Sequence, residues 1–432
     1  MKRSRYRPTG VRPYLSAAAF IAFLGLLLVM VTAESAFAQP GPPTMQLLPP
    51  TPAAQAQATQ ALEAFWTPER MKNAIPPPVP SPVGSGAQPT LSSLPPGATP
   101  GFSPGWQPGI PSPDPTIEYE IIPGAALRGL STTPVQPQTT PPFSPPSTPT
   151  DFDNYAPFQR WTWLGRYLTY PVSTIGKLFF TQPGACAAGC VCTASVIGTR
   201  AIATAGHCVH NGNNNNSGFS TDVLFCPSYN QAGVNPSRGC WAGGSETTSF
   251  QWFNAANFDR DYACIVTAAT GTLIANSVGN VTGATGRAWN FPSKQMVFSF
   301  GYPQTSPFDG TIIITTASTE WYEVDIVAGD GQVSKYIGSD QTGGSSGGPW
   351  WLNLRHPTAE VADTDGSDIT DPAQGQCCPW INGVNSHKRC TTAGCPAGTV
   401  FTQEQGSPQF RNTAGDNNES EDVFAVCFSN GG

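Results

Sequence analysis

The sequence predicts an all-β fold of short antiparallel strands, as in a β-sandwich or a pair of β-barrels. Apolar or alternating runs recur through the last two thirds of the chain, and glycine, asparagine and proline clusters separate them. No segment there has a long helical period. The runs are TIGKLFFT, CTASVIG, AIATA, YACIVTA, QMVFSFGY, GTIIITTA, EWYEVDIV and WINGVNS.

The first 38 residues have the pattern of a secretory signal. Basic residues precede an apolar run from Ala17 to Val31, and Ala36-Phe37-Ala38 follows. We therefore expect a signal peptide over 1–38, cleaved after Ala38, and no membrane association afterwards. An uncleaved anchor is the alternative, although the run is short for a spanning helix.

Residues 39–150 form a proline-rich segment. Of the 45 prolines, 29 lie between Pro40 and Pro149. Such a composition buries too little apolar surface to offset its ordering entropy, so we expect the segment to be largely disordered, as a propeptide or a linker. One stretch, Ala53 to Ile75, could form a short helix that Pro68 interrupts. Residues 151–432 are left as the folded domain.

All twelve cysteines lie between Cys186 and Cys427, beyond the proline-rich segment. An even count behind a secretory signal predicts disulfides and a secreted, periplasmic or extracellular protein. The alternative is a metal site at Cys186, Cys190 and Cys192, but the ligand spacing of a tetrahedral zinc site is missing. We expect no metal and no cofactor.

The charge pattern argues against a nucleic-acid partner. The net charge is −7, only 11% of the residues are charged, and no basic stripe occurs. An acidic insertion at 354–380 resembles a calcium loop only loosely, because the ligand spacing of an EF-hand is absent. A solvated acidic loop is the simpler interpretation, and calcium or partner binding stays open.

The stretch QTGGSSGGPWW, from Gln341 to Trp351, raises the possibility of a nucleophilic serine. A serine hydroxyl is a weak nucleophile that needs an adjacent base, held in the right tautomer by a third group. His207 follows an alternating strand in AIATAGHC, and Asp261 begins another strand in FDRDYACIV. Ser346, His207 and Asp261 could fill the three roles, with Asp259 as the alternative to Asp261.

TAGHC and GGSSGGP resemble the histidine and serine motifs of chymotrypsin-like, or trypsin-like, serine peptidases, which share the chain order His, Asp, Ser. YPVSTIGKLFF and FGYP are similar to the glutamyl-endopeptidase-like bacterial and fungal branch. The resemblance extends from about Tyr170 to His387. It implies two antiparallel β-barrels with the active site between them, and a secreted, monomeric endopeptidase made as a zymogen, which cleaves protein or peptide substrates through an acyl-enzyme.

Residue by residue, the resemblance implies that Ser346 is the nucleophile, His207 the general base and then acid, and Asp261 the orienting carboxylate. The backbone N–H groups of Gly344 and Ser346 would form the oxyanion hole. The family's disulfide beside the histidine corresponds to Cys192–Cys208. Short loops also make two further pairs plausible, namely Cys226–Cys240 and Cys390–Cys395.

Four residues are candidates for substrate binding. Ser386 matches the family's serine that bonds the triad aspartate. Asn385 stands where glutamate-specific relatives carry a histidine, and His387 shares its strand face. Asp340 lies six residues before Ser346, at a position that selects basic side chains in trypsin. Because aspartate also occurs there in glutamate-cleaving relatives, the preferred residue stays unassigned.

Two other functions remain as alternatives. One is a catalytically silent secreted binding module with the peptidase fold. The other is a serine esterase, because Gly344 to Gly348 also satisfies the G-x-S-x-G elbow of α/β-hydrolases. That elbow requires a strand, a turn and a helix around the serine, whereas PWWLNLRHP is typical of a strand.

Overall fold

The structure is a computed structural model of the chain, which divides into a unit at Met1–Pro40 and a second unit at Gly41–Gly432. The second unit is described by itself. The predicted signal at 1–38 and almost all of the acidic insertion at 354–380 lie outside the described residues. These comprise 40–47, 49, 51–78, 98–109, 157–163, 167–230, 238–291, 295–320, 322–327, 331–352, 379–389 and 403–432.

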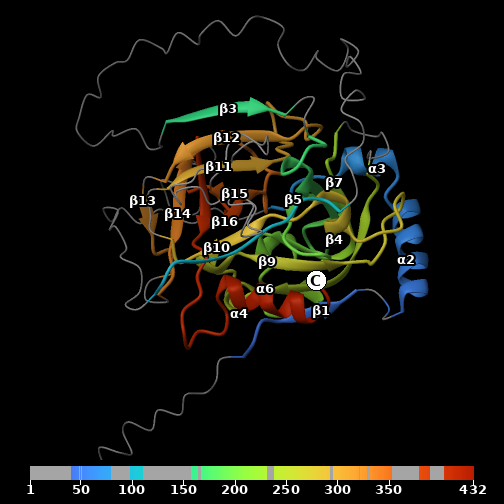
Figure 1. Cartoon of the computed structure of the whole chain (residues 1–432), viewed down its shortest axis with the longest axis horizontal. Helices are drawn as coiled ribbons and strands as arrows, with labels where there is room; N and C mark the ends of the chain where they lie inside the picture. Colours follow the sequence, from blue (N-terminus) through green and yellow to red (C-terminus); the bar gives the residue numbers. More distant parts are fainter. Residues whose placement is uncertain are drawn as a thin grey trace, which may run out of the picture. The chain divides into compact units, whose positions relative to one another are not determined.

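A closed six-stranded antiparallel barrel forms the first half of the predicted domain (Figure 1). The order is β8-β7-β4-β5-β6-β9, and pairing of β8 with β9 closes it. The strands are β4 (Ile175–Gln182), β5 (Cys186–Val196), β6 (Ala201–Thr204), β7 (Thr221–Pro227), β8 (Trp241–Thr248) and β9 (Ala263–Thr267). Every residue of β4 and β9 is buried, which agrees with the apolar runs TIGKLFFT and YACIVTA.

The second half differs from the expected second barrel, because its main sheet is open over the residues described. Its order is β2-β10-β16-β15-β11-β12-β3, and β10 pairs with β16 in parallel. Strands from the N-terminal half, β2 and β3, occupy the two edges. The strands are β2 (Gly101–Ser103), β3 (Phe158–Thr162), β10 (Gly286–Trp289), β11 (Met296–Gly301), β12 (Ile314–Thr319), β15 (Pro349–Leu352) and β16 (Trp380–Val384).

A small third sheet has the order β13-β14-β17. It consists of β13 (Tyr322–Val324), β14 (Ser334–Gly338) and β17 (Glu404–Pro408). Three short α-helices accompany the sheets, and the last of them is tied to β9 by the disulfide Cys264–Cys427. These helices are α4 (Phe250–Ala255), α5 (Val278–Thr282) and α6 (Ser420–Ser429).

The described parts of the proline-rich segment contain regular structure, including helix within the stretch Ala53 to Ile75 where a short helix was expected. β1 (Thr44–Gln46) pairs with β8, and two helices, α2 (Pro52–Phe65) and α3 (Pro68–Asn73), lie against the barrel strands (Figure 1). The predicted interruption at Pro68 is confirmed, since Pro68 begins α3. Between the helices, Trp66 is only 2% exposed. A large aromatic side chain such as Trp66 buries much apolar surface, which the high proline content of the segment does not indicate.

The expected disulfide Cys192–Cys208 is present, and so is Cys226–Cys240. Cys186–Cys190 and Cys264–Cys427 were not anticipated. Cys390 and Cys395 lie outside the described residues. Among the helices described, none is both long and apolar enough to cross a bilayer.

Candidate active site

His207 lies at the end of the barrel strand β6, within the short 3₁₀ helix η4 (Gly206–Cys208), and is only 4% exposed. Its ring Nδ1 is 2.8 Å from Asp261 Oδ2, and its backbone N–H donates to Asp261 Oδ1 at 2.7 Å. The neighbouring Cys208 is linked to Cys192 on β5. The ring is therefore held by the carboxylate on one side while a covalent link fixes its backbone.

Asp261 lies between the 3₁₀ helix η6 (Phe258–Arg260) and β9, and is fully buried. The Ser386 hydroxyl donates to its Oδ2 at 2.5 Å. Burial by itself would raise the pKa of this carboxyl, but the charge of His207 and hydrogen bonds from His207 and Ser386 lower that pKa below its usual value. The carboxylate is thus ionised at neutral pH.

Asp259, the alternative orienting carboxylate, is used elsewhere. Its Oδ2 accepts from the backbone N–H groups of Ile326 and Val327 at 2.8 and 3.0 Å, and its Oδ1 accepts from Ser334 Oγ at 2.7 Å. These bonds attach η6 to the third sheet. The structure therefore brings Asp261, and not Asp259, to His207.

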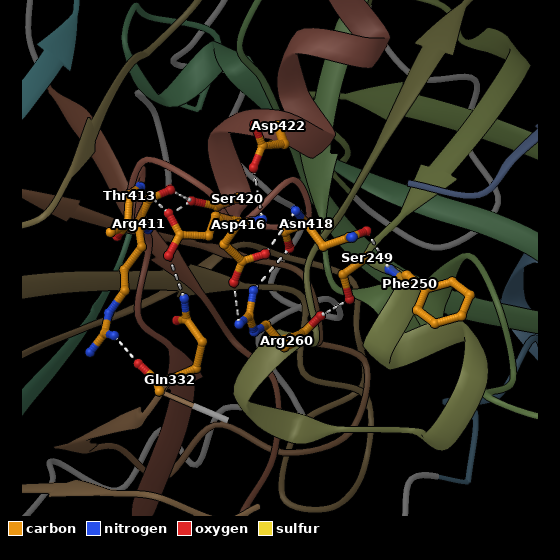
Figure 2. Close-up of polar contacts among 12 residues, drawn as sticks. Ser249, Phe250, Arg260, Gln332, Arg411, Thr413, Asp416, Asn418, Ser420 and Asp422 are labelled. Carbon is orange, nitrogen blue, oxygen red and sulfur yellow. Dashed lines mark hydrogen bonds and ion pairs between the residues drawn. The ribbon is translucent and has the colours of Figure 1, made fainter. Parts of the chain in front are cut away.

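The C-terminal segment holds both neighbours of Asp261. Arg260 pairs with Asp416 at 2.6 Å and donates to the carbonyl oxygen of Asn418 at 3.3 Å (Figure 2). The hydroxyl of Tyr262 donates to the same carbonyl oxygen at 2.8 Å. Because residues 260 and 262 are both anchored, the backbone at Asp261 has little freedom to move away from His207.

The glycine-rich loop around Ser346 is a tightly packed turn. Gly344 and Gly347 have φ values of 99° and 80°, which L side chains rarely adopt. Thr193 on β5 donates two hydrogen bonds to the loop. Its Oγ1 is 2.9 Å from the carbonyl oxygen of Gly344, and its backbone nitrogen is 2.7 Å from the carbonyl oxygen of Ser346. The Ser345 hydroxyl donates to the Thr342 carbonyl oxygen at 2.8 Å. The loop is thus fixed against the barrel and is no flexible linker.

The N–H groups of this loop differ in whether they have an acceptor. Those of Ser345, Gly347 and Gly348 donate to carbonyl oxygens of Thr342, Asn385 and Ser345. By contrast, the N–H groups of Gly343, Gly344 and Ser346 donate to no acceptor in the described part of the chain. The last two of these are the donors expected from the sequence for an oxyanion hole.

The serine loop abuts the segment that leads to His207. A Cβ on Gly347 would overlap Thr204 Oγ1 and would lie 2.9 Å from the backbone nitrogen of Ala205. His207 Nε2 is buried and makes no hydrogen bond to any described residue, including the half-buried Ser346. Hydrogen bonds of this kind are often long before a substrate binds.

The four candidate substrate contacts take different positions. Ser386 contacts Asp261, as expected. Asn385 is fully buried and its amide donates to the carbonyl oxygens of Phe300 and Ser345 at 2.8 and 3.2 Å, so it supports the serine loop. His387 is buried behind Ser386. Neither Asn385 nor His387 offers a surface to a substrate.

Asp340 is partly exposed and forms an ion pair with Arg160 of β3 at 2.5 Å. No local sequence signal links these two residues, which are 180 positions apart. Among the described residues, one cluster has metal-ligand geometry, namely Cys192, His207 and Cys208. Both of its sulfur atoms are already in a disulfide, so the cluster does not fit a metal ion.

The comparisons with known proteins found no matching family model and no matching curated protein. The chain structurally resembles bacterial serine proteases. Protease Anisep from Arthrobacter nicotinovorans is 23% identical, with a TM-score of 0.46, over 63% of this chain and 100% of that one. A thermostable serine protease, AL20, from an extremophilic microorganism is 27% identical, with a TM-score of 0.42, over 59% and 96%.

A Glu endopeptidase solved in complex with MPD is 17% identical, with a TM-score of 0.40, over 65% of this chain and 99% of that one. All three TM-scores lie below 0.5. The assignment of the candidate site therefore rests on its own geometry and chemistry.

Proposed function

We propose that the protein is a secreted serine endopeptidase with Ser346 as nucleophile, His207 as base and Asp261 as the orienting carboxylate. The observation that carries the proposal is the double contact of Asp261 with His207. An ionised carboxylate only accepts hydrogen bonds, so Nδ1 of His207 carries the proton and Nε2 keeps its lone pair. That lone pair is what a general base needs.

The proposed reaction uses these three residues in turn. Nε2 of His207 takes the proton of the Ser346 hydroxyl as Oγ attacks the substrate carbonyl carbon, and the carbonyl oxygen becomes an oxyanion. The free N–H groups of Gly344 and Ser346 stabilise that oxyanion. The imidazolium then gives its proton to the leaving amine, and water repeats the sequence to release the acid and restore Ser346.

The proline-rich segment supports a role as a detachable propeptide that masks the site. Ile75 donates its N–H to the carbonyl oxygen of Gly189 at 3.0 Å, and its own carbonyl oxygen accepts from Val191 at 2.9 Å. Pro76 packs against Gly343, since a Cβ there would lie 2.9 Å from Pro76 Cβ. The segment thus runs beside the loop that carries the proposed oxyanion donors, and we infer that it overlaps the path of an extended substrate.

The four disulfides support a location outside the reducing cytosol. The esterase alternative is disfavoured, because Ser346 is followed by the strand β15 and not by the helix that a nucleophile elbow requires.

The test is covalent labelling with a fluorophosphonate, followed by peptide mapping and a peptide-hydrolysis assay. We expect a single adduct on Ser346, and loss of both the adduct and hydrolysis in Ser346→Ala. Ser345→Ala is the matched control and should still be labelled. An adduct on Ser345, or hydrolysis that persists in Ser346→Ala, would overturn the proposal. A folded protein that is neither labelled nor active would favour the silent binding module.

A further inference from the structure

Three side chains form a chain of hydrogen bonds that begins at Asp261 Oδ2, the oxygen that also faces His207 Nδ1. Ser386 Oγ is 2.5 Å from Asp261 Oδ2, His387 Nδ1 is 2.8 Å from Ser386 Oγ, and Tyr336 Oη is 2.7 Å from His387 Nε2. Tyr336 comes from β14, on the third sheet, whereas Ser386 and His387 follow β16. All three side chains are buried, Tyr336 completely.

The direction of every hydrogen bond in this chain follows from the charge of Asp261. Ser386 has one hydroxyl hydrogen, and it goes to the ionised Asp261, which can only accept. Ser386 Oγ must therefore accept from His387, so the proton of His387 is on Nδ1. A neutral imidazole then has its lone pair on Nε2, and Tyr336 donates its hydroxyl hydrogen there.

The surroundings keep both outer members neutral. Burial lowers the pKa of His387 to about 3, with Asp261 opposing and the charges of His207 and Arg389 reinforcing the effect. Burial also raises the pKa of Tyr336 well above its usual value, with Glu404 and Asp259 in the same direction and Arg389 opposed. At neutral pH both side chains are therefore uncharged, and each has one hydrogen to donate. This agrees with the hydrogen-bond directions derived above.

A glycine on the neighbouring strand makes room for the contact between His387 and Tyr336. A Cβ on Gly406 of β17 would lie 2.6 Å from His387 Nε2 and 2.8 Å from Tyr336 Cε1. The ring of Phe258 also packs against His387, with centroids 4.9 Å apart. The imidazole is thus enclosed with its two nitrogen atoms directed at Ser386 and Tyr336.

We propose that Tyr336 and His387 are positioning residues for the catalytic carboxylate, acting through Ser386. This inference rests on the proposed function. The hydroxyl of Tyr336 holds His387 in the Nδ1–H tautomer, and that tautomer keeps the Ser386 hydrogen directed at Asp261. Hydrogen bonds in such a chain also polarise and strengthen one another.

Removal of the Tyr336 hydroxyl has a specific consequence. Without a donor at Nε2, the imidazole is free to move its proton to that nitrogen, and Nδ1 becomes an acceptor. Ser386 can then give its hydrogen to His387, which leaves Oδ2 of Asp261 with one donor fewer. Asp261 would hold His207 less firmly, although no atom that touches substrate has changed.

The first test reads the tautomer directly by NMR on ¹⁵N-histidine-labelled protein. The chain has only four histidines, so single substitutions suffice to assign the signals. We expect His387 as the Nδ1–H tautomer at neutral pH, and a shift towards Nε2–H in Tyr336→Phe. Tyr170→Phe is the matched control, because it removes a buried hydroxyl that donates elsewhere, to the carbonyl oxygen of Ala284.

The second test is a double-mutant cycle in peptide hydrolysis. We expect Tyr336→Phe and Ser386→Ala each to lower kcat about tenfold, with KM changed less than about twofold, because the loss concerns orientation and not binding. Since Tyr336 acts through Ser386, the double variant should be no slower than Ser386→Ala alone. Additive losses would indicate two independent structural effects and would overturn the inference.

The outcomes separate the two proposals. If the wild-type protein neither hydrolyses peptides nor reacts at Ser346, the proposed function fails, and the NMR measurement still decides the tautomer of His387. If the wild type is active, an Nε2–H tautomer or an unchanged kcat in Tyr336→Phe overturns the inference alone. Melting temperatures of all variants distinguish a slow folded enzyme from an unfolded one.

Discussion

Asp261 binds His207 at two points, since one carboxylate oxygen accepts from the backbone N–H at 2.7 Å and the other faces ring Nδ1 at 2.8 Å. The first contact fixes the position of the residue along the chain, and the second fixes the plane and the tautomer of the ring. A carboxylate that made only the ring contact would leave the Cys192–Cys208 disulfide and local hydrogen bonds as the remaining restraints on the backbone of η4.

The first prediction concerns Asp261→Asn. An amide at this position can donate to Nδ1, which favours the wrong tautomer of His207, so kcat should fall on the order of 10⁴-fold. Rates of peptide hydrolysis and of covalent labelling at Ser346 measure the effect. Asp259→Asn is the control, because its three donors belong to other segments. Asp259→Asn should lower the melting temperature while the folded enzyme keeps its kcat. If Asp259→Asn lost activity and Asp261→Asn kept it, the orienting role would belong to Asp259.

The second prediction separates backbone strain from steric fit in the serine loop. Gly347 and Gly184 have similar φ values, 80° and 77°. A Cβ on Gly347 would collide with Thr204, whereas a Cβ on Gly184 would meet nothing within 4 Å. Gly347→Ala should therefore abolish labelling of Ser346, and Gly184→Ala should cost only about 1 kcal/mol of unfolding free energy. Equal labelling of the two variants would contradict the packing described for the loop.

The third prediction tests whether the proline-rich segment masks the site. Ile75→Pro removes the N–H that donates to Gly189, and Ala74 before it already has the extended ψ of 139° that a proline requires. Loss of one hydrogen bond, about 1 kcal/mol, should raise kcat/KM for a peptide substrate roughly fivefold. Ile75→Ala keeps the N–H and should have little effect. If both variants match the wild type, the segment does not compete with substrate.

The fourth prediction concerns Glu246 on β8, which is fully buried and whose two carboxylate oxygens have no hydrogen-bond partner in the described structure. Burial raises the pKa of this carboxyl well above its usual value. The folded state therefore holds a proton that the unfolded state loses above about pH 4.3. Stability should fall as pH rises from there towards the folded-state pKa, and the loss is absent below the unfolded pKa.

Glu246→Gln removes the ionisation, so its effect on the unfolding free energy should be more favourable at pH 8 than at pH 4. Denaturant unfolding at the two pH values measures this difference. A variant whose unfolding free energy differs from that of the wild type by the same amount at both pH values would contradict the raised pKa of Glu246.

The sequence by itself determined the strand-rich class and the candidate residues His207, Asp261 and Ser346. Each of these residues lies beside a local pattern, either the alternation that makes a strand or the glycines that permit a turn. The break at Pro68 was equally local, because proline lacks the N–H that would continue a helix. Such features can be predicted from the sequence because they depend on residues only a few positions away.

Only the tertiary structure decided which distant residues complete the site. Trp66 donates to the carbonyl oxygen of Asp222, 156 positions away, and Tyr336 reaches His387 across 51 positions. The open second sheet likewise depends on β2 and β3 at its two edges, and β2 comes from outside the domain that the sequence delimited. Contacts of this kind form because buried polar and apolar groups must find partners in the folded core, and no local pattern specifies which partner each one meets.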